Sequence, residues 1–133
     1  MGNNDITLNP RVIIIQKLYG YNLNKDSQIT FPKHKYKKFI KDVVLGTIER
    51  KDLIDEFIEQ NLNKDINNNK TEIILKLMIM AAIYEFMFMH KVPNNVVISE
   101  YIKISDFFLE ESKKSFLNAI LDKISKISRI NDA

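Results

Sequence analysis

Apolar residues recur every three or four positions along the whole chain, which is the spacing of one face of an α-helix. The first such segment starts at Asn9-Pro10, because Asn is a favoured N-cap and Pro is favoured in a first helical turn. Its apolar positions continue through Leu18 and Tyr19, and the helix can extend to Leu23. No segment shows the clean alternation of a half-buried strand, so the pattern predicts an all-α protein of six or seven helices.

The same periodicity predicts five further helices. They are expected at about residues 33–50, 53–62, 73–89, 94–104 and 112–127, with loops at 24–32 and 61–69 and a short connector at 107–111. Asn94-Asn95 is the expected cap of the fifth helix. The 73–89 helix is apolar on nearly every face, so we expect it at the centre of the core, with its methionines in the packing. Gly46 lies inside a helix, where Gly costs about 1 kcal/mol relative to Ala, so another helix should approach closely there.

Composition indicates one globular domain spanning residues 1–133, since 45% of the residues are apolar and 28% are charged. The chain has no Cys, which excludes disulfides and thiolate metal sites, and only two His, His34 and His90. It contains no Gly-rich phosphate loop, no His-Glu-x-x-His and no serine-nucleophile or kinase signature. We therefore predict a protein that is not an enzyme and needs no cofactor or metal.

The sequence shows neither a membrane-spanning segment nor an export signal. The N-terminus lacks a basic region followed by an apolar core, and the longest apolar stretch, 73–89, is interrupted by Lys76 and Glu85. The sequence predicts a soluble cytoplasmic protein without membrane association.

The net charge of +3 is small, but the charges are unevenly distributed. Residues 33–51 carry seven basic and two acidic side chains, and residues 52–72 carry two basic and six acidic ones. The basic segment contains Lys33, Lys35, Lys37, Lys38 and Lys41, interleaved with His34 and Tyr36. Such clusters attract nucleic-acid backbones through counterion release. A solvated helix face would give the same pattern. The same alternative applies to the basic face of the last helix.

Several polar side chains stand out on apolar helices. Glu85, next to Tyr84 in the most apolar helix, must reach solvent or find a hydrogen-bonding partner, because burying it unpaired is costly. A structural role and a contact with a partner both remain open for it. Asn118 and Asp122 lie four residues apart, on one face of the last helix, where they can bond a neighbouring element or face a ligand.

A set of short segments occurs in an order that resembles the NusB family of transcription antitermination factors. The segments are Arg11 with Gln16-Lys17-Leu18-Tyr19, Val43 to Thr47, Ile54-Asp55, Ala82 to Phe86, Val92-Pro93, Ile98-Ser99-Glu100 and Phe116 to Lys123. The resemblance extends from about Arg11 to Lys123. This chain keeps only Arg11 where the family has several Arg, has Met80 where Arg is usual, and has Ser115 in place of a Lys.

The resemblance implies two packed three-helix bundles. It also implies pairing with the ribosomal protein NusE, and binding of the pair to boxA-type single-stranded RNA. That assembly would join an RNA polymerase antitermination complex on ribosomal RNA operons. The RNA contacts carried over from the family are Arg11, Gln16, Tyr19, Lys113, Lys114 and Phe116. Tyr84, Glu85 and Asp122 would be nearer the protein partner or structural.

Two other functions remain open at this level. A NusB-like domain also precedes the catalytic domain of some RNA methyltransferases, and the reduced number of Arg residues fits a helical scaffold that has lost RNA binding. Some family members form a homodimer that hides the RNA surface. Whether the Lys33 to Lys41 segment joins that surface is a question for the structure.

Overall fold

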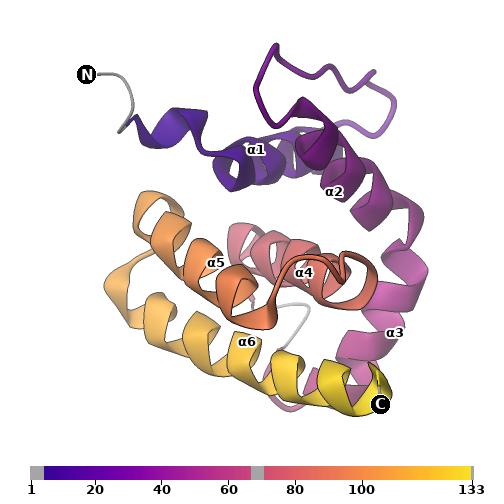
Figure 1. Ribbon diagram of the computed structural model, residues 1–133, viewed down its shortest axis with the longest axis vertical. Coiled ribbons are helices and arrows are strands. Elements are labelled where there is room, and N and C mark those ends of the chain that lie inside the picture. The colour runs from indigo at the N-terminus through magenta and orange to yellow at the C-terminus, as the bar shows by residue number, and fades with distance from the viewer. Residues whose placement is uncertain (1–4, 67–70, 133) are drawn as a thin grey trace.

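A computed structural model describes residues 5–66 and 71–132, with side chains described as far as residue 128. All regular structure within these residues is helical, which confirms the all-α prediction (Figure 1). One 3-10 turn precedes six α-helices, in agreement with the expected number. The elements are η2 (Ile6–Leu8), α1 (Pro10–Leu23), α2 (Lys37–Glu49), α3 (Lys51–Leu62), α4 (Ile73–Phe88), α5 (Asn94–Phe108) and α6 (Glu111–Asp132).

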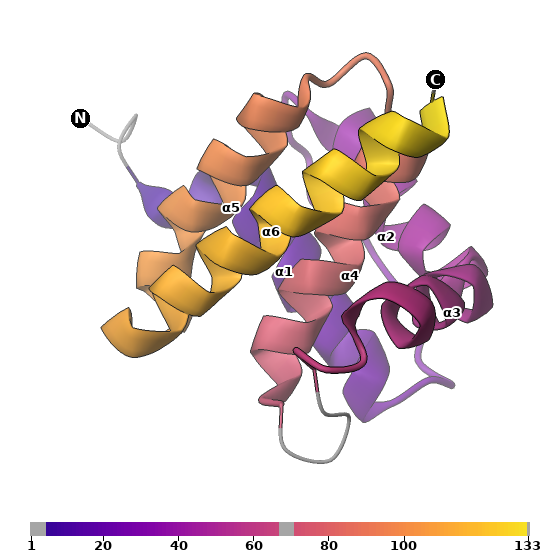
Figure 2. The ribbon, with the colours of Figure 1, turned by 90° about the horizontal axis from the view of Figure 1, so that it is seen from below.

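Helix α4 is the centre of the molecule, as predicted. It contacts each of the other five α-helices, and every residue from Leu77 to Phe86 is buried. In Figure 1, α1 and α2 lie above α4, and α6 lies below it. Figure 2, seen from below, shows α6 in front of α4, with α1 and α2 behind. Helices α4, α5 and α6 all pack against one another, while α3 packs on α2 and α4. No helix in the described part of the chain is long and apolar enough to cross a membrane.

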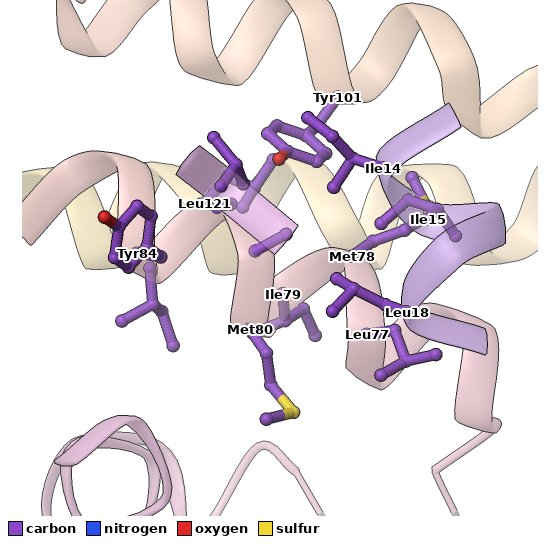
Figure 3. Close-up of a cluster of buried hydrophobic side chains, with 14 of the residues drawn as sticks. Ile14, Ile15, Leu18, Leu77, Met78, Ile79, Met80, Tyr84, Tyr101 and Leu121 are labelled. Atoms are coloured by element: carbon purple, nitrogen blue, oxygen red, sulfur yellow. The ribbon is translucent and has the colours of Figure 1, made fainter. Parts of the chain in front are cut away.

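The part of the core between α1 and α4 is built from apolar side chains of these two helices. Figure 3 shows Ile14, Ile15 and Leu18 of α1 beside the α4 segment from Leu77 to Met80. Met78 is fully buried and Met80 is 5% exposed, so these two methionines pack in the core as expected. Close packing here fixes α1 against α4, and therefore fixes the positions of the polar groups on α1.

The first helix begins as the sequence predicts. The Asn9 side chain accepts a hydrogen bond of 2.9 Å from the Arg11 backbone N–H, and α1 runs to Leu23. The predicted start of the second helix was wrong by four residues, because α2 begins at Lys37. In the preceding loop, His34 Nδ1 accepts from the Tyr36 N–H at 2.9 Å, and Nε2 donates to the Leu8 carbonyl at 2.7 Å. The side chain of His34 therefore holds residues 33–36 outside the helix.

Several other predicted boundaries differ from the structure, including the end of the last helix, which continues past residue 127 to Asp132. Asn94 is not the cap of α5, because it lies in the helix and its side chain donates to the Ser125 hydroxyl on α6 at 3.1 Å. The 107–111 connector is shorter than expected, since α5 continues to Phe108 and α6 begins at Glu111. Helix α3 begins at Lys51, directly after α2. Residues 67–70 of the Asn-rich loop lie outside the described residues.

Gly46 lies beneath a side chain of the central helix, which confirms the predicted close approach. A Cβ built on Gly46 would be 2.1 Å from Cζ of Tyr84. Any side chain at position 46 would therefore occupy the space of the tyrosine ring. Gly is required here for contact between α2 and α4, although it weakens the helix itself.

Candidate functional site

Three polar side chains from three helices meet inside the core. Arg11 of α1 donates to both carboxylate oxygens of Glu85 of α4, from Nη2 at 2.6 Å and from Nε at 3.1 Å. The Tyr101 hydroxyl of α5 donates to Glu85 Oε2 at 2.5 Å. Arg11 is 7% exposed, and Glu85 and Tyr101 are fully buried. We call these three residues the buried triad; it gives the glutamate in the most apolar helix the partners that its burial requires.

The charge states of the buried triad follow from its geometry. Burial acts to lower the pKa of Arg11, but the Glu85 carboxylate outweighs burial and raises that pKa above its ordinary value. Burial, reinforced by the Glu85 carboxylate, raises the pKa of Tyr101 well above its ordinary value. Arg11 is therefore a cation paired with the Glu85 carboxylate, and Tyr101 is a neutral phenol. The guanidinium also lies over the Phe39 ring of α2, 4.9 Å from its centroid, so the triad orients four helices.

This position bears on the RNA role predicted for Arg11. Its guanidinium faces the core, stacked on Phe39 and paired with Glu85, instead of pointing into solvent. An RNA contact by Arg11 stays a prediction. What the structure adds is that Arg11 holds α1 in place against α4, α5 and α2.

The exposed part of α1 follows the buried part. Gln16 and Gly20 are exposed, while Tyr19 is partly buried and packs on the core. A shallow hollow of about 210 Å³ lies between this part of α1 and the following loop. Its lining residues are Gln16, Lys17, Gly20, Tyr21 and residues 27–30. This lining is mostly polar, so the hollow offers hydrogen-bonding groups to a ligand at the surface.

The other predicted RNA contacts lie at the start of α6. Lys113 forms an ion pair with Glu72, and Lys114 forms one with Asp106 at 3.0 Å. These hydrogen bonds raise the pKa of both lysines. Phe116 is half-buried. Because α4 and α5 each pack against both α1 and α6, this group and the Gln16–Tyr19 group lie on different layers of the molecule.

The residues predicted to meet a protein partner are in three different environments. Glu85 is buried within the triad. Tyr84 is 8% exposed and lies at an open groove of about 450 Å³ between α2 and α4. The groove is lined by Lys38, Lys41, Asp42, Leu45, Gly46, Glu49, Tyr84 and Met89. Asp122 is exposed on α6 and forms an ion pair of 2.9 Å with Lys126.

The lysines of the 33–41 segment differ from those of α6. All five are exposed, and within the described residues none of them forms an ion pair. Lys35 Nζ lies 5.4 Å from the ring centroid of Tyr36, which is itself 50% exposed. The docking of this segment through His34 could not be read from the sequence, because the carbonyl that His34 contacts lies 26 residues away.

No group of three or more acidic or histidine side chains that could hold a metal ion occurs among residues 5–66 and 71–132. The described site is therefore built from hydrogen-bonding, aromatic and basic side chains on α1, the loop after it, and the first turns of α2 and α6.

Comparisons with known proteins agree with this architecture. A model of the NusB family matches residues 8–126. Transcription antitermination proteins NusB of Bacillus thuringiensis (strain Al Hakam), Bacillus cereus (strain AH187) and Bacillus anthracis (strain CDC 684 / NRRL 3495) are each 36% identical over 87 residues. The match covers 65% of this chain and 66% of each relative, just under two thirds of its length. A solved structure of T. maritima NusB has a similar fold, with a TM-score of 0.77 and 24% identity, covering 90% of this chain and 89% of that one.

Proposed function

This chain belongs to the NusB family, and from that premise we propose that it is a transcription antitermination factor that binds single-stranded RNA together with the ribosomal protein NusE. Its target would be boxA-type RNA, within an RNA polymerase antitermination complex on ribosomal RNA operons in the cytoplasm. The observation that supports this most is the family match over residues 8–126, which includes both groups of predicted RNA contacts.

The exposed part of α1 supports a role in base recognition. Single-stranded RNA is bound by stacking bases on aromatic rings and by hydrogen bonds to base edges. Gln16 is exposed and borders the polar hollow, and Tyr19 offers a partly exposed ring from the same helix. We propose that these two residues contact bases, and that Arg11 acts through the buried triad as a positioning residue.

The start of α6 supports phosphate contacts. The ion pairs of Lys113 and Lys114 lie at the surface, where such pairs contribute about 0–1 kcal/mol each. An RNA phosphate can therefore replace Glu72 or Asp106 as the partner of the lysine at little cost. Phe116, one turn along the helix, would place its partly buried ring beside that phosphate.

The protein partner is proposed to bind on a different part of the surface. Tyr84 borders the open groove between α2 and α4, and Asp122 is exposed on α6. We propose that NusE contacts these two side chains, and that Glu85 supports the contact indirectly, by fixing the helix that carries Tyr84.

The proposal is tested by titrating a labelled boxA-type RNA, and a scrambled RNA of equal length, with and without NusE. NusE should raise the affinity for the boxA-type RNA more than for the scrambled one. Replacing Gln16 by Ala should reduce that preference, because it removes a hydrogen-bonding group from the RNA surface. Gln60→Ala, an exposed glutamine on α3, is the matched control and should change nothing. The proposal fails if NusE binds the protein but adds nothing to the affinity for RNA.

One observation favours a second candidate, a helical scaffold without RNA binding. The three predicted RNA cations, Arg11, Lys113 and Lys114, all have carboxylate partners in the structure. The same titration separates the two functions, since a scaffold would bind NusE while showing no salt-dependent affinity for either RNA.

A further inference from the structure

The positive charges of this protein are compensated in some regions and uncompensated in others. Arg11 is paired in the core, and the described lysines of α6 are paired with carboxylates. These pairs are Lys113–Glu72, Lys114–Asp106, Lys123–Asp65 and Lys126–Asp122. The five lysines between residues 33 and 41 have no such partner among the described residues. Although Asp42 and Glu49 also lie on α2, the segment from residue 33 to 41 has five cations and no anion.

This lysine-rich segment is held in a fixed position beside α1. The hydrogen bond from His34 to the Leu8 carbonyl ties it to the turn just before α1. Phe39, on the first turn of α2, lies under the Arg11 guanidinium. Because Phe39 faces inward, Lys37, Lys38 and Lys41 are exposed on the outer side of the same helix.

The segment also continues the polar hollow on α1. Residues 27–30 of the loop line that hollow together with Gln16 and Lys17. The same loop then leads within a few residues to Lys33 and Lys35, so it runs from the middle of α1 back to its start. In Figure 1 this loop lies at the top of the molecule, next to α1 and α2. One surface therefore connects the proposed base-contacting residues to the uncompensated lysines.

We propose that Lys33, Lys35 and Lys37, which we call the lysine strip, bind the backbone phosphates of the single-stranded RNA that α1 contacts, whereas Lys38 and Lys41 line the groove beside Tyr84. This inference rests on the proposed function and extends its RNA surface from α1 to the start of α2. Lysines supply affinity through phosphates without reading sequence. Tyr36, half exposed within the strip, offers a ring on which a base stacks.

The alternation of lysines with His34 and Tyr36, and the continuity with a polar hollow, favour RNA over an anionic membrane surface. A membrane-binding segment would present an apolar face beside its lysines. Here the inward side of the first turn of α2 is occupied by the contact of Phe39 with Arg11.

The test compares two double variants that lose the same charge. Lys35→Ala/Lys37→Ala removes two residues of the lysine strip. Lys64→Ala/Lys123→Ala removes one lysine that follows α3 and one on α6 that pairs with Asp65, in segments at the opposite side of the molecule in Figure 1. RNA affinity is measured by fluorescence anisotropy with NusE present, for a boxA-type and a scrambled RNA, between 50 and 200 mM salt. Circular dichroism confirms that all variants are folded.

The expected result is a loss of about 5-fold in affinity per lysine at 0.1 M salt, or about 25-fold for the strip variant. The slope of log affinity against log salt should become shallower by about 1.4, and both RNAs should lose equally, as phosphate contacts require. The Lys64→Ala/Lys123→Ala control should keep the affinity and the slope of the wild type.

Three results would overturn the inference. The first is an unchanged salt slope in the strip variant, and the second is an equal loss of RNA affinity in the control variant. The third, from a parallel assay with phosphatidylserine vesicles, is a strip variant that loses vesicle binding but keeps its RNA affinity. The proposed function fails on its own if NusE adds neither affinity nor preference for the boxA-type RNA, while the strip variant still has a lower affinity for both RNAs than the wild type. If the wild-type protein binds neither RNA, both proposals are wrong.

Discussion

Replacing Arg11 by Met should be among the most damaging single substitutions in this protein. Removing the guanidinium leaves the fully buried Glu85 carboxylate without a cation, and a broken buried ion pair costs about 3–5 kcal/mol. Total stabilities of such domains are about 5–15 kcal/mol, so the loss is a large part of the whole. For a chain of this length, it corresponds to a melting temperature lower by about 10–18 °C.

Chemical denaturation of the variant measures this loss, and Lys51→Met is its matched control. Lys51 pairs with Asp55 at the surface, where both side chains are partly exposed, so the control should lose less than about 1 kcal/mol. A further variant with Arg11→Met, Glu85→Met and Tyr101→Phe should regain most of the stability, since it leaves no buried polar group unpaired. The reasoning is refuted if Arg11→Met and Lys51→Met lose equal stability.

Three further predictions concern the packing and the loop. Gly46→Ala should lower the free energy of unfolding in urea by about 1–2 kcal/mol, because the new Cβ takes the place of the Tyr84 ring. In a Tyr84→Ala background the same substitution should instead stabilise α2 by about 1 kcal/mol. If the effect has the same sign in both backgrounds, the contact between Gly46 and Tyr84 is refuted. Burial raises the pKa of Tyr101 in the folded protein above its value of about 10 in the unfolded chain. The free energy of unfolding should therefore fall above pH 10, by about 1.4 kcal/mol per pH unit. Tyr101→Phe should flatten that decline in alkaline denaturation curves. His34→Ala should speed amide hydrogen exchange at Tyr36, which loses its acceptor, and an unchanged rate would exclude this bond.

Local sequence signals were sufficient for most of the fold. The Asn9-Pro10 start of α1 depends on two adjacent residues, and the central place of α4 depends on its apolar composition. Even the approach of α4 to Gly46 could be inferred, because a glycine inside a helix needs a reason. These features depend on few residues close together in sequence, so periodicity and capping rules find them.

The remaining features depend on partners far apart in the chain. Arg11 and Glu85 are 74 residues apart, and nothing near Arg11 distinguishes an inward guanidinium from one that faces a ligand. The α2 boundary was wrong because His34 bonds a carbonyl of η2 and so draws residues 33–36 away from the helix. Asn94 likewise contacts Ser125 instead of capping α5. Side chains that can bond several partners are where pattern-based prediction fails, because the tertiary fold chooses the partner.

Gly20 has a practical consequence for following this protein in solution. A Cβ at this position would meet no atom within 4 Å, and the residue borders the hollow beside Gln16 and Lys17. Because the chain contains no cysteine, Gly20→Cys would carry the single thiol of the molecule. A dye or spin label attached there would report occupancy of the α1 surface from a single site, with no other substitution required.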